Sequence, residues 1–278
     1  MNISTFNLEL YQRVWHRLNQ SKIVTSSATP PSEKIFPVPI QVFDRLTSTN
    51  TKTWELIDRQ TKTPCGVIAL QQTAGKGQWG NKWASPKGGL YLSLGLSVDL
   101  DLQNLSHLVM ATAWGVAKTL RYYQLPVTIK WSNDLILEHR KLGGIKIETR
   151  NRDRQITKAV VGIGLNWQNP VPDLGINLDS YYQQRASVKI DSLEELAAIA
   201  SYGIFLGYNY YRTFGIAQLL VQYTAILNSL GKKVIVDDRP GKVVGVTLDG
   251  KIRIRLQHQV PAKITEVAFA PGQISLGY

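Results

Sequence analysis

The sequence has a single cysteine, Cys65, which excludes an internal disulfide framework and any metal site built from a cysteine cluster. No apolar run approaches the roughly eighteen residues of a membrane-spanning helix, and no basic-then-apolar leader begins the chain. The four histidines have neither metal-site nor triad spacing, and no serine lies in a nucleophile-elbow pattern. We therefore expect a cytoplasmic protein without a membrane partner, and nothing supports an intermediate bound covalently to the protein.

No run of five or six charges of one sign occurs, although 32 Lys and Arg residues outnumber 20 Asp and Glu residues and give a net charge of +12. Scattered positive charge suits solubility and the attraction of anionic nucleotides or an acidic protein partner. We expect no dedicated nucleic-acid binding. The apolar fraction of 44% is ordinary, and 278 residues suffice for one large domain or for a large and a small one.

The N-terminal segment predicts one helix over residues 5–20, where apolar side chains follow a helical spacing, and then a loop at 25–32. A helix-turn-helix or winged module needs three helices and about sixty residues, but only 47 residues precede Ser48. We therefore expect residues 1–42 to form an extension that does not bind DNA.

Residues 43–230 alternate between strand and helix patterns, which favours a mixed layered fold. Strands are predicted at 67–70, 90–96, 127–131, 145–148 and 159–165. One helix is predicted from residue 105 for about twenty residues, and another from a capping box at 192–195 towards 230, with a break near Gly215. Beyond a boundary at 229–231, strands at 234–236, 242–246 and 251–256, with a hairpin turn at Asp249–Gly250, predict a small antiparallel barrel over 231–278.

Four short fragments carry residues suited to chemistry: Ser48–Asn50, Thr73–Trp83, Lys130–Asp134 and Lys141–Ile145. In the second, glycines allow the backbone to approach a ligand, while two lysines and two tryptophans offer cations and aromatic faces to a phosphate and an adenine. Its spacing fits neither a P-loop nor a dinucleotide fingerprint. Singly, the fragments also have ordinary explanations: a helix cap, a surface loop, a strand running into a turn, and a solvated lysine before a strand.

Together and in this order, the fragments resemble the catalytic domain of the biotin protein ligases, with Ser132 replacing the proline of a Lys-Trp-Pro-Asn-Asp signature. The resemblance implies an α+β fold: a mixed β-sheet flanked by helices, like a class II synthetase, with a small C-terminal SH3-like β-barrel. It implies an N-terminal extension over 1–42, a catalytic domain over 43–230 and a β domain over 231–278.

The implied activity is that of a monofunctional ligase. It would activate biotin with ATP and Mg²⁺ to biotinyl-5′-AMP and transfer biotin to a lysine of the biotin carboxyl carrier protein of acetyl-CoA carboxylase. The resemblance leaves a monomer or a homodimer open.

The resemblance also assigns roles to individual residues. Those that would bind biotin are Ser48, Thr49, Asn50, Gln72, Gly75, Lys76, Lys141, Gly144, Gly162 and Gly164. Those that would bind ATP are Lys76, Gln78, Trp83, Lys130, Asn133, Lys141 and Asn166. Lys141, Lys76 and Asp134 would be catalytic, with Asp134 on the metal and Lys141 between the biotin carboxylate and the α-phosphate.

The glycine-rich loop departs from the arginine-rich family pattern at Lys76, Gln78 and Asn81. Lysine keeps the charge without the bidentate fork, and glutamine keeps neither, which predicts weaker retention of the adenylate. Ser132 lacks the fixed φ of proline, so the rigidity of its turn must come from packing.

Three alternatives stay open. A lipoyl or octanoyl transferase has the same fold class, although its Ser-Gly-Gly-Gly loop and His-Asp pair are missing here. A ligase-repressor is disfavoured by the short N-terminal segment. A non-enzymatic module built around the terminal barrel would leave the clustered lysines, tryptophans and glycines unexplained.

Overall fold

The computed structural model describes residues 6–21, 23, 36–185, 189–257 and 265–277. Its helices are α1 (Leu8–Gln20), α2 (Thr49–Asp58), α3 (Leu105–Tyr122), α4 (Leu178–Gln183) and α5 (Leu193–Ala225). The strands of the first sheet are β1 (Ile40–Leu46), β2 (Cys65–Gln72), β3 (Leu90–Asp101), β4 (Thr128–Lys130), β5 (Asp134–Leu137), β6 (Arg140–Arg152) and β7 (Gln155–Leu165). Those of the second are β8 (Lys233–Val236), β9 (Arg239–Val246), β10 (Ile252–Leu256) and β11 (Thr265–Phe269).

The first sheet has seven strands in the order β1-β2-β3-β7-β6-β5-β4. Strand β1 runs parallel to β2, and the other neighbours pair antiparallel. This confirms the predicted mixed sheet. The central strands β3 and β7 are buried along most of their length, because helices cover the sheet on both faces.

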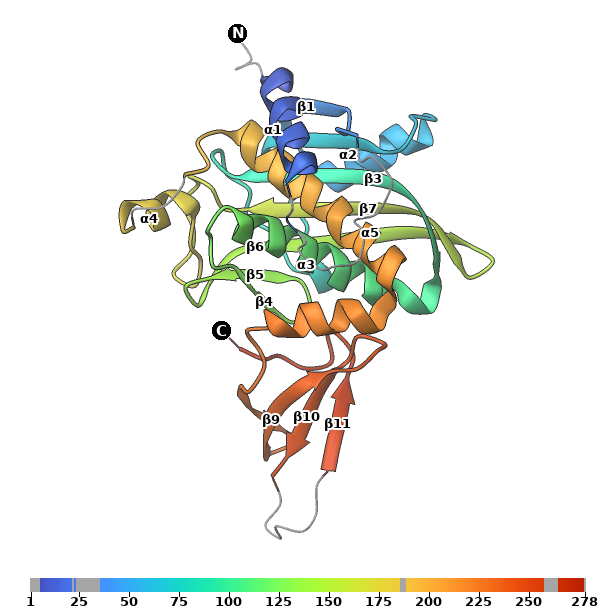
Figure 1. Cartoon of the computed structure of the whole chain (residues 1–278), viewed down its shortest axis with the longest axis vertical. Coiled ribbons are helices and arrows are strands. Elements are labelled where there is room, and N and C mark those ends of the chain that lie inside the picture. Colours follow the sequence, from blue (N-terminus) through green and yellow to red (C-terminus); the bar gives the residue numbers. More distant parts are fainter. Residues whose placement is uncertain (1–5, 22, 24–35, 186–188, 258–264, 278) are drawn as a thin grey trace.

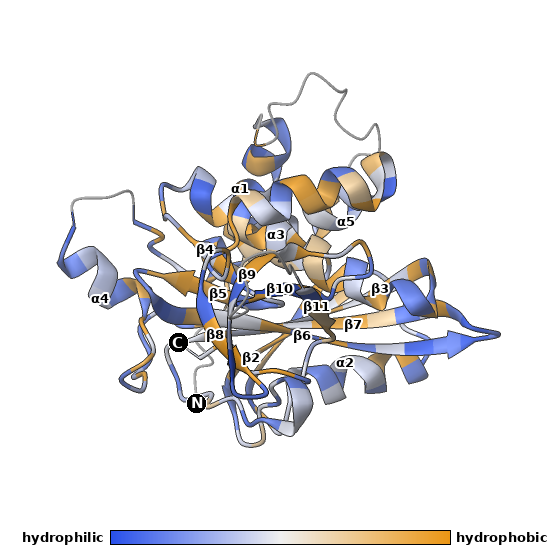
Figure 2. Cartoon of the chain, turned by 90° about the horizontal axis from the view of Figure 1, so that it is seen from below, coloured by the Kyte–Doolittle hydropathy of each residue, from blue (hydrophilic) through white to orange (hydrophobic). Residues whose placement is uncertain are grey.

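Helices α3 and α5 pack together on one face of the sheet with α1 against α5, while α2 lies on the other face against β2 and β3 (Figures 1 and 2). The close approach of α3 and α5 depends on Gly115, Gly203 and Gly207, where a Cβ atom would meet the backbone of the facing helix. The predicted break in α5 is confirmed at Gly215, whose φ of 73° suits glycine.

The second sheet has four antiparallel strands in the order β11-β10-β9-β8 and lies beyond the β4 edge of the first (Figure 1). The predicted small antiparallel unit is therefore present, and its described strands form an open sheet with β8 and β11 at its edges. Trp131 Nε1 donates to the Gly250 carbonyl at 3.0 Å, and the His107 ring lies 2.8 Å from the Leu248 carbonyl. These bonds tie the turn after β9 to the first sheet and to α3.

Most predicted elements are confirmed, and the differences concern their lengths and the short elements. The structure adds β1, β5, α4 and β11, which the sequence patterns did not predict. Strand β6 starts at Arg140, so Lys141 lies within a strand and not before one. The loop predicted at 25–32 lies outside the described residues. In the described part of the chain, no helix is long and apolar enough to cross a membrane.

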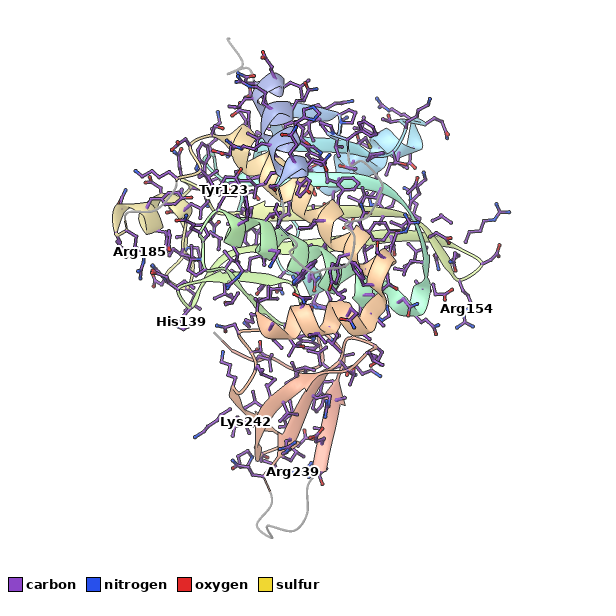
Figure 3. All side chains as sticks on the ribbon, viewed as in Figure 1. Tyr123, His139, Arg154, Arg185, Arg239 and Lys242 are labelled. Carbon is purple, nitrogen blue, oxygen red and sulfur yellow. The ribbon has the colours of Figure 1, made fainter. Side chains whose placement is uncertain are left out.

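The positive charge is spread over separate elements. Figure 3 shows Arg154 at the tip of the β6–β7 hairpin, Arg185 beyond α4, and Arg239 and Lys242 on the second sheet, all directed outward. This distribution agrees with the scattered charge of the sequence.

Candidate functional site

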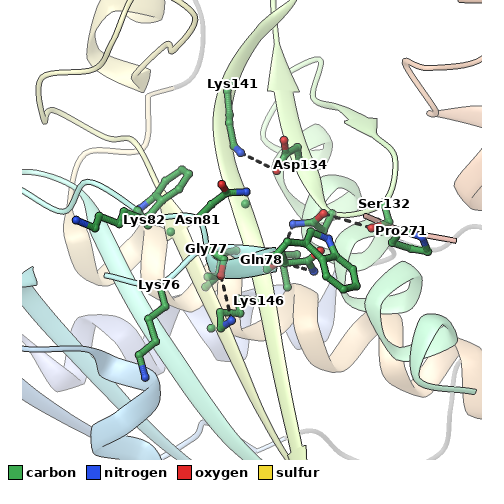
Figure 4. A pocket seen from close by; sticks show the side chains of 18 of the residues that line it. Lys76, Gly77, Gln78, Asn81, Lys82, Ser132, Asp134, Lys141, Lys146 and Pro271 are labelled. Atoms are coloured by element: carbon green, nitrogen blue, oxygen red, sulfur yellow. Dashed lines mark hydrogen bonds and ion pairs between the residues drawn. The ribbon is translucent and has the colours of Figure 1, made fainter. Parts of the chain in front are cut away.

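A cavity of about 510 Å³ lies between the glycine-rich loop, strands β4 to β7 and the C-terminal segment. This volume is within the range of small-molecule sites. Fourteen of the predicted site residues line it: Ser48, Thr49, Asn50, Gln72, Lys76, Gln78, Trp83, Lys130, Asn133, Asp134, Lys141, Gly144, Gly162 and Gly164. The four fragments thus lie around one cavity (Figure 4).

One end of the cavity is a neutral polar pocket at the start of α2. Gln72 Oε1 accepts from Thr49 N at 2.8 Å and from Thr49 Oγ1 at 3.1 Å, while Gln72 Nε2 donates to Ser85 Oγ at 2.8 Å. Ser48 occupies the N-cap position of α2, but its side chain makes no capping bond. Ser48 also lines the cavity, which favours a ligand role over the simple capping explanation.

Asn50 adds an unsatisfied donor to this pocket. Its Oδ1 lies 2.6 Å from Ser93 Oγ, but its buried Nδ2 has no hydrogen-bond partner among the described residues. Asn50 also faces Gly162, where an added Cβ would lie 3.0 Å from its Cγ. A buried amide without a partner costs about 1–3 kcal/mol, so a ligand acceptor here would be stabilising.

Five lysines line the cavity as a whole, namely Lys76, Lys82, Lys130, Lys141 and Lys146, with Asp134 as the single carboxylate among the described lining residues. Lys76 Nζ donates to Thr51 Oγ1 at the start of α2 at 3.2 Å, whereas Lys130 and Lys141 lie beside Asp134 and make the other end of the cavity cationic. Lys141 Nζ lies 2.8 Å from Asp134 Oδ1. Burial lowers the pKa of Lys130 to about 8, an effect that nearby Asp134 opposes and the charges of Lys141 and Lys232 reinforce.

Packing holds the turn from Lys130 to Asp134, as expected for a chain without proline at Ser132. The Ser132 carbonyl accepts from the Tyr223 hydroxyl at 2.9 Å, and Trp131 N donates to Ser229 Oγ at 3.2 Å. Asn133 Nδ2 donates to the Ile145 carbonyl at 2.8 Å. The peptide bond between Trp131 and Ser132 is cis.

Trp83 forms the wall between the two ends. Lys141 Nζ lies 5.4 Å from the centre of a Trp83 ring, within the distance of a cation–π contact. The indole rests on Gly164, where an added Cβ would lie 2.6 Å from its Cε2. The absence of a side chain at Gly164 therefore lets the indole approach the sheet closely.

Two predicted residues do not line the cavity. Gly75 is buried, and its carbonyl accepts from Trp83 N at 2.9 Å, so it packs under the loop. Asn166 donates to the Lys141 carbonyl at 3.3 Å and accepts from Asn169 at 3.0 Å. Its amide is used within the protein, and its contact with the nucleotide stays a prediction.

Sequence reasoning missed two parts of the cavity. Lys146 lines it from β6, one pleat beyond Gly144. The segment from Pro271 to Leu276 forms another wall after the chain returns from the second sheet. The alternation of Ile145–Glu148 is a signal that could have found Lys146, because it places this lysine opposite the apolar face of the strand, but no sequence signal pointed to the C-terminal segment.

Residues 42–166 match the biotin/lipoate A/B protein ligase family. They form a domain of that family. This domain contains the polar pocket, the glycine-rich loop and all five cavity lysines, and it spans both lysine-bearing fragments, Lys130–Asp134 and Lys141–Ile145.

Comparisons with individual proteins agree with the family domain. The chain is 31% identical to the bifunctional ligase/repressor BirA of Bacillus subtilis over 153 residues, which are 53% of this chain and 47% of that protein. It is 30% identical to the biotin–[acetyl-CoA-carboxylase] ligase of Paracoccus denitrificans over 112 residues, which are 39% and 46% of the two chains. The chain thus spans about half the length of these curated relatives.

The fold is also that of a solved structure, the biotin protein ligase from Aquifex aeolicus in complex with biotin and ATP. The TM-score is 0.64 with 22% sequence identity, and the match covers 82% of this chain and 95% of the other. At this identity the likeness shows the fold, a mixed sheet flanked by helices with a small antiparallel sheet after it.

Proposed function

We propose that this protein is a biotin–protein ligase, which joins biotin to a lysine of a carrier protein at the expense of ATP. The observation that carries the proposal is the adjacency of two unlike environments in one cavity. A neutral polar pocket at Thr49 and Gln72 suits a ureido ring, and the lysines around Lys141 suit a polyphosphate. The family domain and the names of the relatives support the same activity.

The first step joins two anions, and Lys141 stands where they would meet. An oxygen of the biotin carboxylate attacks the α-phosphorus, the bond to the β-phosphate bridging oxygen breaks, and pyrophosphate leaves with that electron pair. Negative charge grows on the α-phosphate oxygens during this exchange. A fixed ammonium group, held at 2.8 Å by Asp134, stabilises that charge without having to reorganise.

In the second step the amine of an acceptor lysine attacks the carbonyl carbon of biotinyl-5′-AMP. An amide bond forms, AMP leaves as the phosphate anion, and the amine loses a proton. The glycine-rich loop would exclude water, which would otherwise hydrolyse the mixed anhydride. Because ATP is the co-substrate, we place this reaction in the cytoplasm.

The residues present fit a Mg²⁺ ion only in the company of a nucleotide. Asp134 supplies one carboxylate, and no group of three or more His, Cys, Asp or Glu side chains in the described part of the chain could hold a metal alone. Mg²⁺ commonly takes one or two carboxylates together with substrate phosphates. Bound there, it would supply neutralisation of phosphate charge beside Asp134.

The acceptor we propose is the biotin carboxyl carrier protein of acetyl-CoA carboxylase. The name of the Paracoccus denitrificans relative supports this choice. The net charge of +12 would favour an acidic acceptor through long-range attraction. Such steering predicts that raising the ionic strength slows acceptor modification, and a rate insensitive to salt would contradict it.

The test is the intact mass of a carboxyl carrier domain after incubation with this protein, biotin, ATP and Mg²⁺. We expect a single biotin adduct with the wild type and with Lys158→Ala, a β7 lysine whose Nζ bonds Ser97 Oγ outside the cavity. We expect at least a hundredfold loss, roughly, with Lys141→Ala.

The other outcomes separate the alternatives. Pyrophosphate release that depends on biotin, without an adduct on the carrier domain, would support the activation step and contradict the proposed acceptor. Competition by free lipoate at the same concentration as biotin would favour the lipoyl transferase. Neither adduct nor pyrophosphate would overturn the proposed function.

A further inference from the structure

The glycine-rich loop is a small hairpin and not an open coil. Gly77 N donates to the Asn81 carbonyl at 2.7 Å and Trp83 N to the Gly75 carbonyl at 2.9 Å, while Lys76 and Lys82 face each other as a β-bridge. The turn between them contains Trp79 and Gly80, both at positive φ. The loop therefore moves as one unit, and whatever holds its tip holds all of it.

Two side-chain bonds join this hairpin to strand β6. Lys146 Nζ donates to the Gly77 carbonyl at 3.0 Å, and Gln78 Nε2 donates to the Ile145 carbonyl at 3.2 Å (Figure 4). The Ile145 carbonyl also accepts from Asn133, so its two lone pairs serve both the loop and the turn after β4. The hairpin thus accepts a bond from Lys146 of β6 and donates one to the adjacent residue Ile145.

The tip of the hairpin also reaches the C-terminal segment. The ring of Trp79 lies over Gly272, whose φ is 90° and where an added Cβ would come within 3.0 Å of the ring. The hairpin therefore spans the cavity from β6 to the segment after the second sheet. The contacts of Lys146, Gln78 and Trp79 are all made within the protein and need no ligand.

We propose that Lys146 and Gln78 are positioning residues that hold the hairpin of residues 73–83 closed over the cavity. Gln78 stands where an arginine was expected to bind the intermediate, and its amide is bonded to the strand instead. Lys146 supplies the opposing bond from the strand to the loop. Retention of a bound intermediate would then depend on a fastened loop more than on arginine contacts.

The loop carries its own reporter, because trypsin cleaves after Lys76 and Lys82. Cleavage of a structured hairpin follows the population of its opened form. One hydrogen bond contributes about 1 kcal/mol, which lowers the population of the opened hairpin by about fivefold. Limited trypsin digestion without nucleotide, followed by mass spectrometry of the cuts at Lys76 and Lys82, measures the opening directly.

We expect Lys146→Met and Gln78→Ala each to be cut about fivefold faster than wild type, and the double variant about twenty-five-fold faster if the bonds act independently. Lys146→Arg retains a donor and should restore slow cutting. Lys158→Met removes a lysine of the neighbouring strand and should cut like wild type. Thermal unfolding of each variant separates local opening of the loop from loss of the whole fold. If Lys146→Met does not fold, the cutting rate of Lys146→Arg tests the proposal instead.

Cutting of Lys146→Met and Gln78→Ala at the wild-type rate would overturn this proposal. A consequence for the intermediate rests on the proposed function: both variants should release biotinyl-5′-AMP about fivefold faster. If the wild type forms no adenylate, the proposed function fails while the digestion still decides whether the loop is fastened. If adenylate forms and both variants retain it as the wild type does, the role in retention is wrong.

Discussion

Alanine at Gly164 should push Trp83 off the sheet. The added Cβ would lie 2.6 Å from Cε2 of the indole, about 0.8 Å short of the 3.4 Å at which ordinary contact begins. The strand cannot yield, since β7 pairs with β3 on one side and β6 on the other. The indole must therefore move, and overpacking of this kind costs about 1–3 kcal/mol of unfolding free energy.

The displaced ring should also weaken biotin binding, because Lys141 lies over it. A change of about 1.4 kcal/mol in that contact corresponds to a tenfold higher dissociation constant. Urea denaturation measures the stability, and calorimetric titration with biotin measures the affinity.

Gly144→Ala is the matched control for stability, because Gly144 is the cross-strand partner of Gly164. The nearest atom to its added Cβ is Asp134 Oδ1 at 3.3 Å, so the loss should stay below about 1 kcal/mol. If Gly164→Ala matched the wild type in stability and in biotin affinity, Gly164 would be an ordinary strand residue and the reasoning from Trp83 would be wrong.

Three further predictions concern the scaffold. Tyr223→Phe removes the donor to the Ser132 carbonyl and should lower the free energy of unfolding, measured by urea denaturation, by about 1–2 kcal/mol. An unchanged free energy would show that this hydrogen bond does not stabilise the turn. Gly207→Ala places a Cβ 2.6 Å from a carbonyl carbon of α3, so the melting temperature should fall by several degrees, roughly, and an unchanged one would show that the helices can separate. Burial lowers the pKa of His107 beside the Leu248 carbonyl, so its neutral form is favoured in the folded state. Stability should therefore be lost as pH falls below the ordinary 6.5, because the unfolded chain takes up that proton first, and His107→Gln should flatten the decline.

The sequence predicted the parts of the site that are written as contiguous fragments. Ser48–Asn50 and Lys130–Asp134 combine a strand end or helix start with polar side chains, so both the local structure and the chemistry could be inferred together. Strands β2, β3 and β7 were recognised because hydrophobic residues dominate them. Strands β1 and β5, with seven and four residues, were missed.

The order of the strands in the sheet and the path of the C-terminal segment after the second sheet could not be predicted from the sequence. The alternation around Lys146 indicates a side chain on the polar face of a strand. It does not indicate that this face meets the glycine-rich loop, because that depends on β6 lying beside β7. The wall from Pro271 to Leu276 depends on tertiary packing over a still longer distance.

Glycine was ambiguous for a related reason. A glycine in a loop fits close approach to a ligand and close packing within the protein equally well. Gly75 bonds to Trp83 and closes the hairpin from below, whereas Gly164 leaves room for the same tryptophan from the side of the sheet. Only the fold separates these two roles.

The charge of the cavity and the bonds that hold its loop both bear on how an anionic ligand is bound and oriented. Five lysines and one carboxylate line the cavity, and a polyphosphate would neutralise their excess positive charge on binding. Burial, reinforced by the charges of Lys141 and Lys232, already lowers the pKa of Lys130. Lysines act as point charges and do not fix the orientation of an anion as the arginine fork does. Orientation must then come from the backbone and from the shape of the cavity. The bonds of Lys146 and Gln78 to the loop and to β6 provide that shape, so a lysine-lined cavity can be selective as long as its loop stays attached.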